Sequence, residues 1–114
     1  MYWIILYIII DIIWIKLNRE MYKKNIEKIQ KEKMEIKVIP GMIAYALMII
    51  NIIYVLKPNL KRKIDYGIVG LVIYGVYNAT NKATLKEYKT EVMIKDTLWG
   101  FVSHYMIGYY MIGT

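Results

Sequence analysis

The chain of 114 residues contains no cysteine and a single histidine. Without cysteine it can form neither a disulfide framework nor a thiolate metal site. His104 cannot build a zinc site alone, because zinc needs several protein ligands, and we interpret it as an interior residue and not as a proton relay. We find no catalytic motif either. We therefore expect no metal and no cofactor, and we favour a protein without enzymatic activity over an enzyme.

Long stretches of the chain also lack charge. Hydrophobic residues make up 58% of the sequence, whereas a soluble domain has about 45–50%. The runs without Asp, Glu, Lys or Arg, apart from Asp11 in the first, are Met1–Ile15, Val38–Leu56, Tyr66–Ala79 and Thr97–Thr114. Each run approaches the roughly 17–25 residues that a spanning helix needs, although the third reaches this length only if its polar C-terminal end is included. Because they leave no room for a soluble domain, residues 1–114 are predicted to form a single transmembrane domain.

The predicted fold is an all-α membrane protein, a four-helix transmembrane bundle with an amphipathic interfacial helix in its first loop. We expect the spans at about residues 1–17, 38–56, 66–83 and 95–114. In the polar loop Asn18–Lys37, the residues Tyr22, Ile26 and Ile29 recur at helical spacing, which predicts a helix at the membrane surface. The later segment Thr84–Val92 is predicted to be a short, solvated helix.

The basic residues indicate a membrane surface as the partner. The net charge is +7, which is also typical of nucleic-acid binding, but no motif for that function accompanies it. We expect contact with a lipid bilayer and its anionic headgroups, a protein partner for the basic loops, and no nucleic acid. The linker Lys57–Lys63 carries 4 of the 16 basic residues, and the other 12 lie in or beside the first and third loops. The positive-inside rule places those loops in the cytoplasm, although the basic linker argues against it.

Polar residues gather at the ends of the predicted spans. Asp11 lies late in the first span, Asn78 late in the third and Asp96 early in the fourth. Because neighbouring spans run antiparallel, these residues fall in the same half of the bilayer, where a carboxylate costs about 2.5–3.5 kcal/mol on insertion scales. The candidate ligand-binding residues, which include no catalytic residue and no metal ligand, are Asp11, Trp14, Tyr77, Asn78, Thr80, Asn81, Lys82, Asp96 and Trp99.

Two interpretations of this polar cluster remain open. The side chains could form a pocket for a lipid headgroup, an ion or a small metabolite. Alternatively, the two aspartates could cap helices, pair with Lys or Asn, and hold the bundle together. The segments Ile9–Trp14 and Ile94–Trp99 are similar, since each places Trp three residues after Asp on one helix face. We expect a chance match here in preference to a true internal repeat.

The central segment also resembles a known family. The pattern YGxYxxTNxATL followed by DxxWG, which begins at Tyr74 and ends at Gly100, resembles the small bacterial membrane proteins grouped as domain-of-unknown-function family 2177. Asp11, Trp14 and Tyr22 are similar to that family's first span and the element after it. Large DNA viruses of algae and protists have related proteins, and the segment LNREMY resembles theirs more closely. Asn78 departs from the pattern, because the family usually has Asp there.

The resemblance implies an architecture and a shared site but no reaction. Our first hypothesis is a small multi-pass integral membrane protein with a polar site at one leaflet, which binds or transports a small or lipid ligand. The alternative is a structural membrane component of a virion or of a larger complex. An enzyme acting on a lipid-borne substrate comes third, because two aspartates without a histidine or metal motif are weak evidence of catalysis. The expected location is a membrane of a cell or an organelle, or the inner membrane of a virion.

Overall fold

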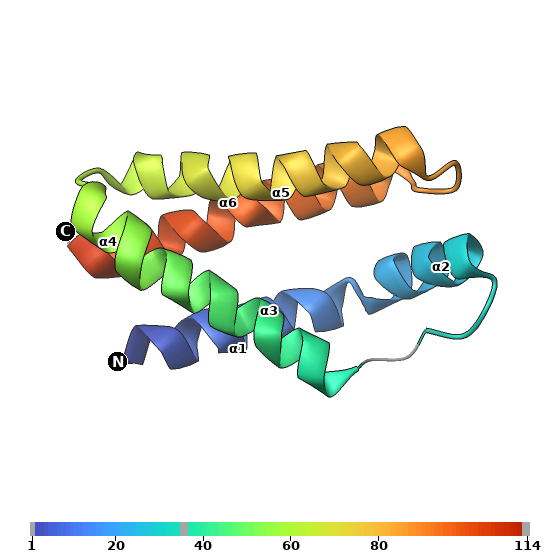
Figure 1. The fold of residues 1–114 in the computed structure, drawn as a ribbon, viewed down its shortest axis with the longest axis horizontal. Helices are drawn as coiled ribbons and strands as arrows, with labels where there is room; N and C mark the ends of the chain where they lie inside the picture. Colours follow the sequence, from blue (N-terminus) through green and yellow to red (C-terminus); the bar gives the residue numbers. More distant parts are fainter. Residues whose placement is uncertain (1, 35–36, 113–114) are drawn as a thin grey trace.

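The computed structural model describes residues 2–34 and 37–112, and all regular elements in these ranges are helical (Figure 1). The elements are α1 (Tyr2–Leu17), α2 (Arg19–Gln30), α3 (Val38–Asn51), the π-helix η1 (Ile52–Leu56), α4 (Lys57–Asn59), α5 (Lys63–Thr84) and α6 (Thr90–Ile112). The all-α prediction is confirmed for these ranges. The outermost residues of the predicted first and fourth spans, namely 1, 113 and 114, lie outside the described residues.

The long helices run back and forth along one direction. In Figure 1, α1 begins and α6 ends on the left, where the turn between α4 and α5 also lies. The helix α2 and the turn between α5 and α6 lie at the opposite end. α5 and α6 pack against each other along most of their length. The structure therefore has the antiparallel order on which the predicted depth of the polar residues depended.

Glycines permit the close packing of α5 on α6. A Cβ atom added to Gly70 would lie 2.0 Å from the carbonyl oxygen of Gly100, and one added to Gly100 would lie 2.6 Å from that of Gly70. Further along the interface, Gly108 faces the side chain of Tyr66, which an added Cβ would approach to 2.8 Å. Small residues let helix backbones approach in this way. The two backbones touch directly at the Gly70–Gly100 contact, which fixes how α6 faces its neighbours.

The elements α3, η1 and α4 form one continuous helix from Val38 to Asn59, which has 22 residues. A window of 18 residues within it has a mean hydropathy of 2.1. Within residues 2–34 and 37–112, this helix alone is long and apolar enough by composition to cross a membrane. Pro40 lies in its first turn, where a missing N–H is tolerated. The π-helical turn directs Ile52 and Leu56 into the core, although most of the helix is exposed.

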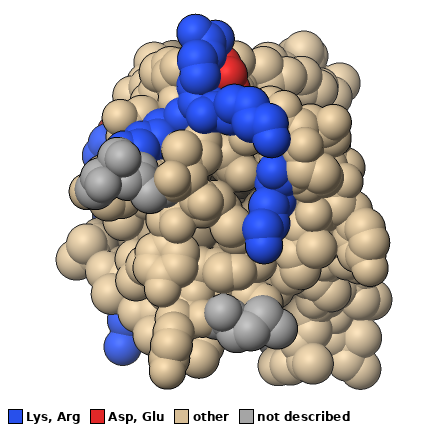
Figure 2. Space-filling view, turned by 90° about the vertical axis from the view of Figure 1, so that its left-hand side faces the viewer, with Lys and Arg blue, Asp and Glu red and all other residues tan. Residues whose placement is uncertain are grey.

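The rest of the outer surface is also apolar. A buried core of Trp3, Tyr7, Ile52, Leu56, Tyr66 and Ile107 fills the end of the molecule where the turn between α4 and α5 lies. Outside this core, large apolar side chains such as Ile12, Leu47, Ile68 and Leu98 are exposed on every long helix. Soluble monomers rarely expose apolar surface so widely. At that same end, Lys and Arg side chains form an arc across the surface (Figure 2), where the basic segment Lys57–Lys63 lies.

The polar segment between the first two long helices is helical, as predicted. Its lysines Lys24 and Lys28 are exposed, and Tyr22 and Ile29 are half-buried. Ile26 is 38% exposed, however, and the residue of this face that is fully buried is Asn25, with 1% exposed. α2 does not simply continue α1, because Asn18 departs from helical geometry with φ −111° and ψ 18°. The resulting kink brings α2 against the turn that precedes α6.

The prediction of a short solvated helix over Thr84–Val92 is wrong. α5 continues to Thr84, a turn follows, and α6 begins at Thr90, five residues before the predicted start of the fourth span. Tertiary hydrogen bonds override the local preference in this turn. The hydroxyl of Tyr88 donates to Asn78 at 2.5 Å, and Nζ of Lys82 donates to the carbonyl oxygen of Tyr88 at 2.8 Å. These bonds fold the turn back onto α5.

Candidate functional site

Asp11 is a buried carboxylate that links three helices. It lies on α1 with 8% of its surface exposed. Nε1 of Trp99 on α6 donates to its Oδ1 at 2.8 Å, and the hydroxyl of Tyr45 on α3 donates to its Oδ2. Both carboxylate oxygens therefore have a neutral donor. Buried charge is tolerated under this condition, because hydrogen bonds replace the lost hydration.

Asp96 lies at the centre of a second set of bonds, nearly two helix turns beyond the start of α6. The hydroxyl of Tyr22 on α2 donates to Oδ1 at 2.6 Å, and Nδ2 of Asn78 on α5 donates to Oδ2 at 2.7 Å. Asn78 is fully buried and accepts a bond from Tyr88 through its own Oδ1. Asp96 therefore links α6 to α2 and α5, and Asn78 extends this set of bonds to the turn before α6.

A pair of tryptophans joins the two carboxylates. The rings of Trp14 and Trp99 are parallel, with their centroids 4.7 Å apart. Nε1 of Trp14 donates to the hydroxyl of Tyr22 at 2.9 Å, and Tyr22 in turn donates to Asp96. Each indole thus supports the aspartate of the opposite helix, one directly and one through a tyrosine. We call this set of residues, Asp11, Trp14, Tyr22, Tyr45, Asn78, Tyr88, Asp96 and Trp99, the polar network.

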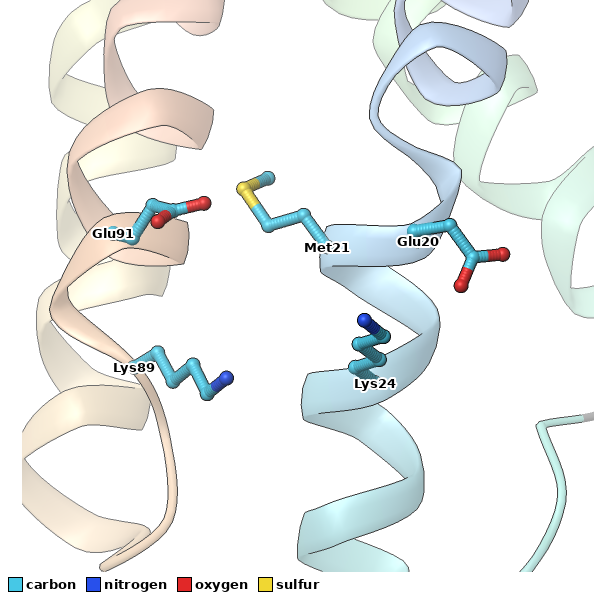
Figure 3. Close-up of a pocket in the computed structure, with 5 residues that line it drawn as sticks. All are labelled: Glu20, Met21, Lys24, Lys89 and Glu91. Carbon is cyan, nitrogen blue, oxygen red and sulfur yellow. The ribbon is translucent and has the colours of Figure 1, made fainter.

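Two hollows lie beside the polar network. The first, the charged hollow, has a volume of about 290 Å³ and lies between α2 and the start of α6 (Figure 3). It is lined by Glu20, Met21, Lys24, Lys89 and Glu91. The second, the apolar hollow, has a volume of about 240 Å³ and lies between α1 and α6. It is lined by Ile10, Ile13, Trp14, Leu17, Trp99 and Met106, so the stacked indoles form part of its wall.

Comparison with known protein families identifies the chain. The family model described as "Predicted membrane protein (DUF2177)" matches residues 1–112. The chain belongs to this family. No curated protein and no solved structure matches it. The DUF2177 family is described as a membrane protein without an assigned activity, so together with the apolar helix Val38–Asn59 the match indicates association with a membrane.

The remaining candidate residues of this DUF2177 protein lie outside the polar network. Tyr77 is 63% exposed, and Thr80 is also exposed, on the outer face of α5. Asn81 is half-buried, and its carbonyl oxygen accepts the N–H of Leu85 at 2.8 Å, which closes the end of α5. Lys82 holds the turn through Tyr88. In the described ranges neither aspartate forms an ion pair with a lysine, so neutral donors replace the expected counter-charges.

Asn78 occupies the position where the resemblance to the family led us to expect an aspartate. Its amide uses both ends, because Nδ2 donates to Asp96 and Oδ1 accepts from Tyr88. A carboxylate here could not donate to Asp96 unless it carried a proton. The amide therefore keeps a single negative charge at this point of the network.

Besides Tyr22, which was predicted only as part of the interfacial helix, the sequence reasoning missed three residues in or beside the polar network. Tyr45 lies in an apolar run, and no pattern in that run indicates which face of the helix is turned toward Asp11. Asn25 donates to the carbonyl oxygen of Glu87 at 2.7 Å and accepts the N–H of Lys89 at 3.1 Å, so one amide joins α2 to the turn before α6. Asn25 lies three residues after Tyr22 on the same helix face, and this spacing was the available signal. The third, Tyr88, lies in the turn that was predicted to be helical.

The hydroxyls of Tyr22 and Tyr88 remain hydrogen-bond donors. Burial, together with the bond to Asp96, raises the pKa of Tyr22. Burial also raises the pKa of Tyr88. Both hydroxyls therefore keep their protons over the physiological pH range and continue to donate to Asp96 and Asn78.

His104 is buried on α6 and forms no hydrogen bond with the polar network. Its Nδ1 lies 3.1 Å from the carbonyl oxygen of Gly100, and its ring makes edge contacts with Tyr7 and Tyr74. Among the described residues, no three side chains of His, Asp or Glu come together as possible metal ligands. The polar network can therefore hold the helices together beside the lysines of the charged hollow. Among the described residues, its carboxylates do not form a metal site.

Proposed function

We propose that this protein is a multi-pass membrane protein that binds a ligand with an anionic group in the charged hollow, at the surface of one leaflet. The observation that carries the proposal is the placement of two lysines on facing walls. Lys89 extends from the start of α6 toward α2, and Lys24 lies opposite on α2 (Figure 3). Two ammonium groups across one hollow favour a phosphate or carboxylate between them.

The surrounding ion pairs leave these two lysines available. Glu91 lies 3.7 Å from Lys95, and Lys28 lies 3.2 Å from Glu87. Within residues 2–34 and 37–112, Lys24 and Lys89 take part in no ion pair. Glu20 and Glu91 also line the hollow, but neither forms an ion pair with Lys24 or Lys89.

The dimensions of the helices support several spans. α5 has 22 residues and α6 has 23, which at 1.5 Å per residue gives lengths of about 33–35 Å. The hydrocarbon core of a bilayer is about 30 Å thick. Exposed apolar residues such as Ile68, Val72 and Val102 line their outer faces. We therefore propose that α5 and α6 cross the membrane beside Val38–Asn59. We propose that α1, whose 16 residues measure about 24 Å, crosses most of that thickness with them.

The polar network has a structural role in this proposal. Each of the four oxygens of Asp11 and Asp96 accepts a bond from the protein itself. A ligand at either carboxylate would have to share an oxygen that already accepts a bond from the protein. We infer that Asp96, through Tyr22, holds α2 against α6, so that Lys24 and Lys89 face each other, and that the ligand binds to the lysines. Asp11 instead joins α1 to α6 and α3.

The double variant Lys24→Gln, Lys89→Gln tests this function. Purified protein in detergent is titrated with inorganic phosphate and with glycerol 3-phosphate, and the melting temperature is followed. A ligand that binds only the folded state raises the melting temperature with concentration. We expect this rise for the unmodified chain and its loss in the double variant.

A matched control removes two lysines at the opposite end of the molecule. Lys57→Gln, Lys61→Gln changes the net charge by the same amount but leaves the charged hollow intact. The control should respond to phosphate as the unmodified chain does. An equal loss of response in both double variants would mean that total charge, and not the hollow, determines binding.

A further inference from the structure

We infer that the ligand is a single glycerophospholipid with a phosphate and a primary ammonium in its headgroup, as in phosphatidylethanolamine. Its phosphate lies between Lys24 and Lys89 in the charged hollow, and one acyl chain lies in the apolar hollow against Trp14 and Trp99. This inference rests on the proposed function of the charged hollow. The proposed function requires only an anionic group, and the inference assigns that group to the headgroup of a lipid.

The two hollows lie along one seam. The residues of α1 and α2 that line them follow one another at helical spacing, namely Ile10, Ile13, Trp14, Leu17, Glu20, Met21 and Lys24. Backbone bonds of helical type continue across the kink, since the N–H of Asn18 bonds the carbonyl oxygen of Trp14 and that of Tyr22 bonds Asn18. On the other side, α6 lines both hollows. A ligand can therefore follow the seam from one hollow to the other.

The length of the seam matches one leaflet. Lys24 and Ile10 are 14 positions apart, which corresponds to about 21 Å along a helix. A bilayer with its headgroups is about 40–45 Å thick, so a leaflet measures about 20–22 Å. The charged hollow lies at the polar end of the seam, and the apolar hollow lies deeper. This is the order of polarity along a lipid molecule.

The apolar hollow offers nothing to a water-soluble ligand. The indole N–H of Trp14 donates to Tyr22, and that of Trp99 donates to Asp11. The ring carbons are therefore left to form the wall, together with aliphatic and Met side chains. Ring faces and methylene groups favour an acyl chain, because its burial requires no hydrogen bond.

The charged hollow favours a headgroup with both signs. Besides Lys24 and Lys89, it is lined by Glu20 and Glu91. The carboxylate of Glu91, 3.7 Å from Lys95, points toward α2, whereas that of Glu20 points away from α6 (Figure 3). A phosphate between the lysines and an ammonium near Glu91 satisfy both signs, whereas a second negative charge in the headgroup would meet Glu91. This complementarity selects phosphatidylethanolamine over phosphatidylglycerol.

Fluorescence quenching by brominated lipid tests the inference. Because the chain has three tryptophans, Trp3→Phe leaves only Trp14 and Trp99, which both line the apolar hollow. The protein in detergent is titrated with phosphatidylethanolamine that carries bromine in its acyl chains. We expect saturable quenching that unlabelled phosphatidylethanolamine reverses. The half-point is the lipid concentration that gives half of the maximal quenching. Adding Lys24→Gln and Lys89→Gln should raise it by about tenfold or more, which corresponds to about 1.4 kcal/mol.

The controls separate this inference from the proposed function. Lys57→Gln, Lys61→Gln should leave the half-point unchanged, and far-ultraviolet circular dichroism should confirm that Trp3→Phe keeps the helices. In the same assay, Ile13→Phe enlarges a side chain that lines the apolar hollow without adding a tryptophan, and it should weaken lipid binding while the response to glycerol 3-phosphate persists.

Three results would overturn the inference. Quenching that never saturates, or that is equal in the lysine variant and its control, would mean that lipid only solvates the surface. If glycerol 3-phosphate still stabilises the chain through the lysines, the proposed function survives this failure; if it does not, both fail. Brominated phosphatidylglycerol that binds as tightly as phosphatidylethanolamine would contradict the assignment of the headgroup.

Discussion

The indole rings of Trp14 and Trp99 stack in parallel with their centroids 4.7 Å apart, yet their N–H groups point to different partners. Trp99 donates directly to the buried carboxylate of Asp11. Trp14 donates to Tyr22, which uses its own proton for Asp96. The pair therefore links the two acidic positions of the chain through one contact between α1 and α6. The two indoles are chemically alike but do not contribute equally.

This difference predicts an order of stability for two matched variants. Trp99→Phe removes a donor from a buried carboxylate oxygen, which should lower the free energy of unfolding by about 1–3 kcal/mol. Trp14→Phe removes a bond to a hydroxyl that keeps its link to Asp96, so the loss should be smaller, about 0.5–1.5 kcal/mol. Both variants lose the same indole N–H and retain an aromatic ring. Thermal unfolding in detergent measures the two, and a larger loss for Trp14→Phe would refute the assigned roles.

Asn78→Asp should make stability depend on pH. The new carboxylate would replace an amide nitrogen that lies 2.7 Å from Asp96, so at neutral pH two negative charges would meet in a buried place. At acidic pH one of them takes up a proton and can donate to the other, so the deficit relative to the unmodified chain should shrink. Melting temperatures of both proteins over a pH series check this. A deficit that is constant with pH would indicate a packing defect instead.

The contact of α5 with α6 predicts a contrast between two glycines. Gly70→Ala places a methyl group 2.0 Å from a backbone oxygen of Gly100, which cannot move aside as a flexible side chain could, so a loss of about 1–3 kcal/mol or more is expected. Gly75→Ala meets only Thr97, at an ordinary distance of 3.5 Å, and should be tolerated. Denaturant unfolding of the two variants provides the comparison. Equal effects would mean that the helices do not approach as described.

The sequence predicted the helical class, for a reason that the structure makes visible: the charge-free runs form long helices. Their antiparallel order brings Asp11 and Asp96 to neighbouring levels of the bundle, while their depth in a membrane stays a prediction. The stacking of Trp14 on Trp99 agrees with their shared position three residues after Asp. These features depend on spacing along one helix, which a sequence records directly.

The unpredicted contacts depend on how helices turn toward each other. Tyr45 reaches Asp11 because α3 presents that face, and an almost uniformly apolar run contains no stripe that would reveal it. The turn before α6 forms through Asn25, Lys82 and Tyr88, each bonded to a distant backbone or side-chain group. The likeness of LNREMY to viral members of the family stays a prediction, because the family match does not distinguish among members.

The central claim is that α2 and the turn before α6 meet at one membrane surface, where the charged hollow opens. Because the chain contains no cysteine, single cysteines can be introduced at the exposed positions Glu32, Lys86 and Lys61. Each variant is embedded in sealed vesicles of known orientation and treated with a thiol reagent that cannot cross the bilayer. We predict that cysteines at positions 32 and 86 react from the same side and that a cysteine at position 61 reacts from the other. Labelling of all three from one side, or of positions 32 and 86 from opposite sides, would contradict the account.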